Sequence, residues 1–421
     1  MSRKVRRQII KALQWSPLWA CAYLWRGLMF RTTFVAVTGS LGKTAAKDCL
    51  AAMLSRSGPT VASRGNENGR TGVIKTILQV RPRHRYAVIE AGTELPGNLW
   101  RASLLIRPDI ALILDVARTH TQSFKNLEEK AKEKSRILRF LRRRGTAVLN
   151  ADDPRVAGMA KSVRGRVVRF GSGEGVLLRH TDAESVWPGR LSFMAESRGD
   201  RVRVETQMIG THRVTSVAGA LAVAVVCGVR LLEAAEAVHD IPVFQARLQP
   251  AALPSGAWML RDEYNGSIDS FEAAVRVLRE AKANRRILVI SDCGNWDERP
   301  QTRQRHFART ARDCADAVIF VGERSEYGVR FALREGMPAG SVRGFLRWEE
   351  AAVFLKEGLQ AGDLVLLRGL QREHLTRIYF SLLGSVECHK ANCTRHDCCD
   401  SCPELGFRPD PSVSTFTICA G

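Results

Sequence analysis

Short apolar runs alternate with longer amphipathic stretches along most of the chain from Thr33 onward. An apolar run rich in β-branched residues predicts a buried strand, and the amphipathic stretch after it predicts a helix. The clearest runs are Val35–Val37, Tyr86–Glu90, Asp109–Leu114 and Thr146–Leu149. This alternation is typical of an α/β domain with a mostly parallel sheet.

The pattern changes between residues 165 and 210, where helical periodicity disappears. Alternating polar and apolar residues over Arg201–Thr206 predict small antiparallel strands attached to the main sheet. Residues 126–144 are strongly charged and residues 214–226 strongly apolar, and both segments predict helices.

After a linker at residues 241–250 the α/β pattern restarts, with a helix expected over residues 270–282 and strands at 286–290, 317–321 and 364–367. We therefore expect a central domain with a mostly parallel sheet and a smaller, Rossmann-like C-terminal domain. The expected parts are a Trp-rich basic segment (1–31), the central domain (32–245), the C-terminal domain (246–385) and a Cys-rich tail (386–421).

The first strand leads through a glycine turn directly into a helix. The residues concerned are Gly39, Ser40, Leu41, Gly42, Lys43 and Thr44. Backbone N–H groups and the helix dipole favour an anion there, a lysine neutralises phosphate charge, and a threonine hydroxyl can bind Mg²⁺. A glycine turn with a purely structural role is the alternative. Gly-Lys-Thr at the first helical turn favours a nucleotide-phosphate site instead.

Three polar residues follow other strands of the same predicted sheet. Glu90 ends one strand, His120 lies in the loop after the next, and Asn150 ends a third. Ligands of open parallel sheets sit at the carboxyl ends of the strands. We therefore expect these residues to share one site with Lys43 and Thr44.

The net charge of +21 in 421 residues is unusual for a chain of otherwise ordinary globular composition. Such charge suits nucleic acid, an anionic membrane surface or polyanionic substrates. Nucleic acid ranks last, because no basic stripe with interleaved aromatic residues and no nucleic-acid-binding motif is found.

Residues 1–31 combine a basic cluster with three tryptophans and a tyrosine. The uncharged stretch from residue 12 to residue 25 is too short to span a bilayer, which takes about 20 residues. Two alternatives stay open: contact with the headgroup layer at the inner face of the membrane, or a helix packed on the body of the enzyme. A secretory signal is rejected, since an ATP-binding domain belongs in the cytoplasm.

Six of the 11 cysteines crowd the last part of the chain. In a reducing cytosol such clustering favours a metal over disulfides. A Zn²⁺ site formed by Cys388, Cys393, Cys399 and Cys402 is our expectation, with a redox or disulfide cluster as the alternative.

Taken together, the motifs resemble the Mur ligase family, and within it the MurF type. The resemblance rests on an ordered set of segments between residues 34 and 370. These are the shortened phosphate loop Thr38–Thr44, the segments Asn66–Gly69, Glu90–Glu94, Ala131–Ile137, Leu149–Asp153, Arg247–Leu248 and Asp262–Ser270, and His120 at the family's Asn-x-x-x-x-His segment.

The resemblance implies a carbon–nitrogen ligase of peptidoglycan biosynthesis that uses ATP and Mg²⁺ and forms an amide through an acyl phosphate. Its substrates would be a carboxylate-bearing acceptor and an amino acid or peptide amine. The implied catalytic residues are Lys43, His120, Lys134 (carbamylated) and Arg247. The implied Mg²⁺ ligands are Thr44, Glu90, His120 and Lys134, and the implied nucleotide contacts are Gly39–Thr44, Asn150, His212, Arg247 and Asp262.

Some of these residues have plainer interpretations when taken singly. Lys134 could be one more solvated charge of its helix, His120 a loop histidine, and Asn150 the centre of an Asx turn.

The chain also departs from the family pattern. Ala246 replaces a glycine, Arg213 replaces the asparagine of a Gly-x-His-Asn segment, and Arg368 replaces the lysine of a Lys-Gly-Ser segment. Because the phosphate loop begins at residue 38, we expect the family's UDP-binding N-terminal domain to be missing and the acyl substrate to be altered. A polymerising ligase similar to the poly-γ-glutamate synthetases and a degenerate ATP-binding scaffold are the alternatives.

Overall fold

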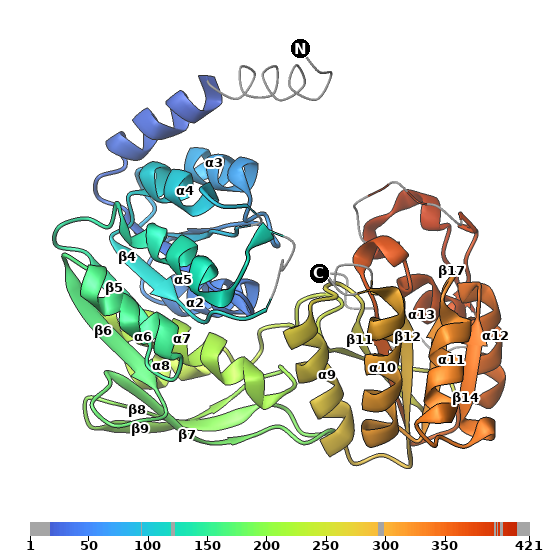
Figure 1. Cartoon of the computed structure of the whole chain (residues 1–421). Coiled ribbons are helices and arrows are strands. Elements are labelled where there is room, and N and C mark those ends of the chain that lie inside the picture. Colours follow the sequence, from blue (N-terminus) through green and yellow to red (C-terminus); the bar gives the residue numbers. More distant parts are fainter. Residues whose placement is uncertain are drawn as a thin grey trace. The chain divides into compact units, whose positions relative to one another are not determined.

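The computed structural model describes residues 17–93, 95–118, 123–293, 299–390, 393, 395 and 399–410. The chain divides into two compact units (Figure 1). The first unit ends at Pro242 and the second begins at Val243, except that residues 185–190 and 208–210 belong to the second.

The first unit is built on one sheet with the strand order β2-β3-β1-β4-β5-β6-β7-β8-β9. Strands β2 to β7 run parallel, and β7, β8 and β9 pair antiparallel. The strands are β1 (Thr33–Thr38), β2 (Thr60–Ala62), β3 (Tyr86–Glu90), β4 (Ile110–Ile113), β5 (Thr146–Asn150), β6 (Arg166–Gly171), β7 (Leu178–Glu184), β8 (Ser192–Ser197) and β9 (Asp200–Glu205). The predicted α/β class and the antiparallel extension are confirmed.

The central strands are buried along their whole length, as expected of a parallel sheet covered by helices on both faces. Phe34, Ala36 and Ile89 pack in one core with helices α3 and α4. Helices α2 and α7 pack together and against the sheet, with Gly219 of α7 close to Leu114. The helices are α2 (Lys43–Ser55), α3 (Arg70–Gln79), α4 (Asn98–Ile106), α5 (Leu127–Ser135), α6 (Pro154–Gly158), α7 (Val214–Val226) and α8 (Leu231–Glu236).

One helix expectation is wrong in extent. The charged stretch from residue 126 forms α5 only to Ser135, followed by a 3-10 turn at Arg136–Leu138. Asn126 caps the start of α5, its side chain accepting a hydrogen bond from the Glu129 N–H at 2.8 Å. Beyond Leu138 the chain continues as turns toward β5, with Leu141 packed against the core and Phe140 against Trp100.

A helix over residues 17–28 precedes β1 and packs on the first unit. The Trp25 indole donates to the Val80 carbonyl (2.9 Å), and buried Arg26 donates to the Ile106 carbonyl (2.6 Å) while lying 3.7 Å from the Phe34 ring centroid. Burial lowers the pKa of Arg26 to about 10. For the segment of residues 1–31, we expected either membrane contact or packing on the body of the enzyme. From residue 17 onward the structure shows packing on the enzyme. Within the described part of the chain, no helix has the length and apolarity to cross a bilayer.

The second unit holds a sheet with the strand order β10-β11-β15-β12-β13-β14, in which only β10 is antiparallel. Its strands are β10 (Gln249–Ala252), β11 (Trp258–Asp262), β12 (Arg285–Ser291), β13 (Ala317–Val321), β14 (Val342–Phe345) and β15 (Asp363–Arg368). Its helices are α9 (Ile268–Glu280), α10 (Pro300–Cys314), α11 (Ser325–Arg334), α12 (Trp348–Gly358) and α13 (Thr376–Leu383).

The described residues beyond α13 pack on this second unit. Strands β16 (Gly384–Ser385) and β17 (Arg408–Pro409) pair with each other, and Phe407 lies against Phe380 of α13. Cys399 and Leu405 join the core formed by α12, α13 and the sheet.

Candidate active site

The phosphate loop joins β1 to α2 and has a backbone shape that requires glycine. Gly42 has φ of 68°, and a Cβ atom there would stand 1.9 Å from the Ser216 Oγ of α7. At Gly39 a Cβ would lie 2.9 Å from the carboxylate of Asp115. Both glycines are therefore fixed by close neighbours from distant parts of the sequence.

The carboxylate of Asp115 lies against the backbone N–H groups of this loop. It accepts hydrogen bonds from the N–H of Ser40 (2.5 Å) and of Leu41 (3.0 Å). Amide groups arranged in this way form an anion-binding nest. An anionic side chain thus stands where the sequence predicts phosphate.

Two lysines lie near this carboxylate. Lys43 Nζ donates to the Ser40 carbonyl at 3.1 Å, folding back over its own loop. Lys134 of α5 is almost fully buried. Burial lowers the pKa of Lys134 well below its ordinary value, and the positive charge of Lys43 acts in the same direction, against the attraction of Asp115. Lys134 is therefore no solvated surface charge.

Glu90 ends β3 with its side chain fully buried. Its Oε1 accepts a hydrogen bond from the Asn68 side chain (2.7 Å), whereas its Oε2 has no hydrogen-bond partner within the described residues. Burying a carboxylate oxygen without a hydrogen-bond partner costs free energy, unless a cation or a hydrogen-bond donor binds to it. Together with the buried Thr44 hydroxyl, this oxygen fits the hard oxygen ligation that Mg²⁺ prefers.

Sheet register brings these groups to one edge. Val37 pairs with Glu90 across β1 and β3, and Thr38 pairs with Ile113 across β1 and β4, so Glu90 and Asp115 both follow strands that flank the loop. The predicted gathering of the loop and Glu90 at one strand edge is present in the structure.

Asn150 has a structural role at the end of β5. Its Nδ2 donates to the Leu114 carbonyl (2.8 Å), and its Oδ1 accepts from the Asp152 N–H (2.9 Å), which forms an Asx turn. The structure therefore contains the Asx turn that was one of the two interpretations of Asn150. The other interpretation, contact with the nucleotide, stays a prediction.

The two predicted histidines differ in what can be said of them. His120 lies outside the described residues. His212 lies in the 3-10 turn Thr211–Arg213 that leads into α7, one turn before Ser216. His212 therefore lies directly before the helix whose Ser216 approaches Gly42 of the phosphate loop.

In the second unit, Arg247 and Asp262 belong to one local arrangement. The Arg247 guanidinium lies over the rings of Phe244 (5.0 Å) and Tyr264 (4.8 Å). Asp262 accepts from the Leu248 N–H (3.0 Å) and forms an ion pair with buried Arg368. Ala246, which stands where the family has glycine, has φ of 53°, a left-handed conformation that glycine adopts at lower cost.

Residues 37–224 match the Mur ligase middle domain, and residues 246–370 match the Mur ligase glutamate ligase domain. A Mycobacterium tuberculosis UDP-N-acetylmuramoyl-tripeptide–D-alanyl-D-alanine ligase is 32% identical over 85% of this chain and 74% of its own length.

The chain belongs to the Mur ligase family. Another relative of the same name, from Escherichia coli, is 31% identical over 69% of this chain and 65% of its own length. The family and the ligase class predicted from the motifs are confirmed, and the chain is accordingly an ATP-dependent carbon–nitrogen ligase.

Solved structures agree with this membership. A crystal structure of MurF from Acinetobacter baumannii has a TM-score of 0.77 and 26% identity, covering 87% of this chain and 79% of that one. A Thermotoga maritima MurF ligase in complex with ADP matches in fold, with a TM-score of 0.74 at 21% identity over 87% of this chain and 82% of that one.

Sequence reasoning missed Asp115. It occupies the first position of the segment that ends at His120, where the family pattern has asparagine. That departure could have been read from the spacing. Its contact with the loop could not, because the two segments are 74 or more residues apart.

Proposed function

We propose that this Mur ligase joins the carboxylate of a peptide-bearing acceptor to the amine of an amino acid or peptide. A carboxylate oxygen attacks the γ-phosphorus of ATP and displaces ADP, and the amine nitrogen then attacks the acyl carbon and displaces phosphate. The observation that carries the proposal is the buried Glu90 Oε2 beside the phosphate loop. The metal ion of a bound metal–nucleotide complex would give this oxygen the partner that it lacks.

Each residue of the loop region then has a stated task. The N–H groups of Ser40 and Leu41 bind phosphate oxygens after the Asp115 carboxylate has moved away from them. Lys43 neutralises the transferred phosphoryl group, which is the main electrostatic requirement of such a transfer. Thr44 and Glu90 would hold Mg²⁺, and this ion would supply positive charge against the phosphates.

Lys134 is proposed as a carbamate that supports a second Mg²⁺ together with His120. Carbamylation requires a neutral amine, whose nitrogen bonds to the carbon of CO₂ as a proton leaves. The burial that lowers the pKa of Lys134 supplies that neutral amine. For His212, Arg247 and Asp262, nucleotide contact stays a prediction from the family pattern.

A pocket next to Glu90 is proposed to hold the acyl substrate. Asn68, which donates to Glu90, lines it together with Gly92, and Trp19 of the helix over residues 17–28 contributes an aromatic wall. Arg70 and Arg101 also line this pocket. Two guanidinium groups suit a substrate with further carboxylate or phosphate groups.

The first substrates to test are those in the names of the relatives. Full-length protein is incubated with ATP, Mg²⁺, D-alanyl-D-alanine and a panel of carboxylates that begins with a UDP-N-acetylmuramoyl-tripeptide. We expect phosphate release that requires both substrates and a new amide detected by mass spectrometry. Lys43→Ala should lower turnover about 100- to 1,000-fold. Nucleotide binding without turnover for any pair would favour the scaffold alternative, and products with repeated additions would favour the polymerising ligase.

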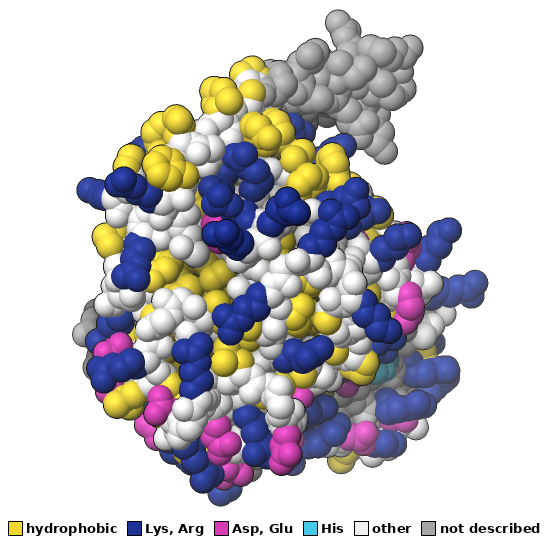
Figure 2. All heavy atoms as spheres, turned by 90° about the vertical axis from the view of Figure 1, so that its left-hand side faces the viewer, with side chains coloured by type: hydrophobic (Ala, Val, Ile, Leu, Met, Phe, Trp, Pro, Cys, Tyr) yellow, Lys and Arg dark blue, Asp and Glu magenta, His cyan; other side chains and the backbone are white. Residues whose placement is uncertain are grey.

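We also propose that the enzyme works in the cytoplasm against an anionic membrane surface. Leu24, Leu28 and Phe30 are 63–69% exposed, and the basic residues Arg31 and Arg81 lie over the rings of Phe30 and Trp25. Figure 2 shows hydrophobic side chains gathered toward the top of this face, with Lys and Arg side chains around them. An apolar band beside basic residues matches anionic headgroups over acyl chains.

Vesicle co-sedimentation tests this surface. Phosphatidylglycerol vesicles should retain the wild type, and phosphatidylcholine vesicles should retain less of it. Leu24→Gln with Leu28→Gln should release the protein, whereas Leu232→Gln, at a leucine of α8 that is 51% exposed, should not. Equal retention of all three proteins would contradict membrane contact.

A further inference from the structure

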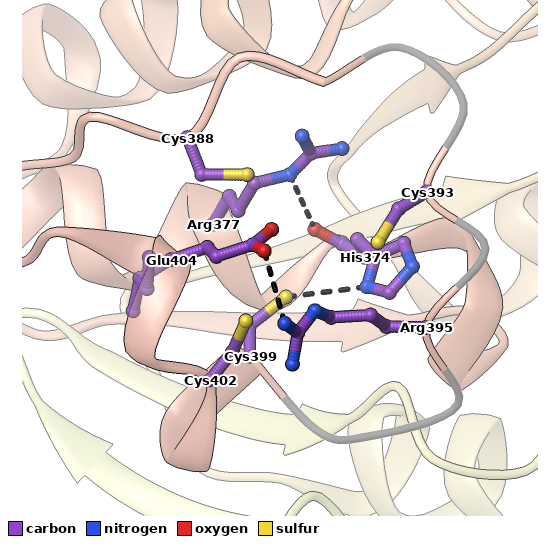
Figure 3. A pocket seen from close by; sticks show the side chains of 9 residues that line it. His374, Arg377, Cys388, Cys393, Arg395, Cys399, Cys402 and Glu404 are labelled. Carbon is purple, nitrogen blue, oxygen red and sulfur yellow. Dashed lines mark hydrogen bonds and ion pairs between the residues drawn. The ribbon is translucent and has the colours of Figure 1, made fainter.

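Side chains of the cysteine-rich end of the second unit line one pocket. Cys388, Cys393, Cys399 and Cys402 all line it, as Figure 3 shows, with His374 on the same wall. All four of these cysteines are free thiols. Four thiols gathered from two short segments around one pocket need a reason, since nothing in the proposed ligase chemistry uses them.

The backbone around the pocket is shaped by short turns. The Cys402 N–H donates to the Cys399 carbonyl (3.1 Å), and the Leu405 N–H donates to the Cys402 carbonyl (3.1 Å). The Cys388 N–H in turn donates to the Leu405 carbonyl (3.2 Å), so the two cysteine-bearing segments are held side by side. A Cys-x-x-Cys turn facing further cysteines is an arrangement typical of structural zinc sites.

Charge and donor type favour the same ligand. A zinc ion bound by four thiolates carries a net charge of −2. Arg377, Arg395 and Glu404 line the pocket, and Glu404 pairs with Arg395 at 2.9 Å, so these three side chains together carry a single positive charge. Soft thiolate ligands select Zn²⁺ over the hard cations that the carboxylates of the first unit would bind. His374 Nδ1 lies 3.2 Å from Cys399 Sγ, within reach as a second-sphere hydrogen-bond donor.

As the side chains stand, no three His, Cys, Asp or Glu residues within the described ranges are spaced to hold one ion together. Rotation about χ1 changes a thiol's direction without moving the backbone, so metal binding can draw the sulfurs inward.

We propose that Cys388, Cys393, Cys399 and Cys402 bind one structural Zn²⁺, and that this ion fixes Asp400 against β11. Asp400 lies between two of the cysteines and forms a two-pronged ion pair with buried Arg261, at 2.6 and 2.9 Å. Arg261 also pairs with Glu263 at 2.7 Å, so the zinc site holds the strand end that carries Asp262.

Metal analysis of the full-length protein tests the ligand set. We expect one zinc per chain, lost in Cys388→Ser and in Cys402→Ser but kept in Cys21→Ser, a control at an exposed cysteine of the first unit. Replacement of zinc by Co²⁺ should give the intense near-ultraviolet thiolate-to-cobalt absorption of a tetrahedral site. Absence of metal together with oxidised cysteines under non-reducing conditions would overturn the proposal in favour of a disulfide cluster.

Hydrogen exchange tests the link to β11 and covers the case in which a cysteine variant fails to fold. Wild-type protein treated with a chelator should exchange faster at residues 258–263 and 386–405, with no change in β1 or β4 of the first unit. Restoration of protection by added Zn²⁺ would support the assignment. Unchanged exchange on metal removal would contradict the role given to Asp400. Neither measurement depends on the ligase reaction.

Discussion

Two strand ends of this molecule treat buried charge in opposite ways. At the end of β3, Glu90 keeps one carboxylate oxygen without a partner within the described residues. At the end of β11, Asp262 meets Arg368 and its neighbour Arg261 meets both Glu263 and Asp400. The carboxylate of Glu90 contacts a neutral amide and leaves capacity for a cation. The charges at the end of β11 are instead ion-paired within the protein, although Glu263 also keeps one oxygen without a hydrogen-bond partner among the described residues. A buried ionisable group therefore indicates a ligand site only when its partners have been counted.

Glu90→Gln is the strongest test of the difference between the two strand ends, and we expect it to have the largest effect on activity. The substitution removes the Mg²⁺ ligand and should lower kcat/KM for ATP about 100-fold or more. It should also raise the stability of the ligand-free protein by about 1 kcal/mol, because a neutral amide is cheaper to bury than an incompletely paired carboxylate. Kinetics and chemical denaturation measure the two effects.

Glu133 is the matched control for Glu90, since it is equally buried. Its oxygens accept from the N–H groups of Gly97 and Leu99 and pair with Arg136. Glu133→Gln should therefore lower stability. A loss of stability in Glu90→Gln equal to that in Glu133→Gln would contradict the cation site.

At the end of β11, Asp262→Asn should lower the stability of the protein, whereas Glu90→Gln should raise it. It leaves the Arg368 guanidinium buried beside a neutral amide, and truncation of one partner of a buried pair typically costs about 3–5 kcal/mol. Denaturant unfolding of the variant measures this cost. Recovery of stability in the double variant Asp262→Asn, Arg368→Met would confirm that the loss comes from the unpaired charge, and a double variant as unstable as the single one would contradict it.

Asp115→Asn tests a second buried carboxylate of the first unit, the one that lies against the phosphate loop. Its carboxylate competes with phosphate for the N–H groups of Ser40 and Leu41. A neutral amide should compete less, so ATP should bind about ten-fold more tightly, which corresponds to about 1.4 kcal/mol. Calorimetry of ATP binding measures the change. Weaker binding by the variant would show instead that Asp115 holds the loop in its binding shape.

Ala246→Gly should give the smallest effect. At φ of 53° an alanine carries a penalty of about 1 kcal/mol that glycine avoids. The variant should be more stable by up to that amount, reduced by the greater freedom of glycine in the unfolded chain. A thermal unfolding scan measures the shift, and lowered stability would contradict the strain.

The sequence was sufficient to predict what depends on local order. Hydrophobic periodicity predicts the two α/β units, and the spacing of Gly39, Gly42 and Lys43 predicts the phosphate loop. The structure was needed where partners come from far along the chain. The carboxylate of Asp115 in the loop, the burial of Lys134 and the ion pair between Arg261 and Asp400 each depend on residues brought together by the sheet. No periodicity in the sequence encodes those pairings.

The contact between Gly42 and Ser216 has a consequence for protein engineering. The phosphate loop is not a portable module, because its tightest neighbour is supplied by a helix more than 170 residues further along the chain. A loop grafted into another scaffold would need an equivalent small residue on a supporting helix. A larger side chain at Ser216 would press on Gly42 from α7 and deform the nucleotide site, although every residue of the phosphate-loop motif would be unchanged.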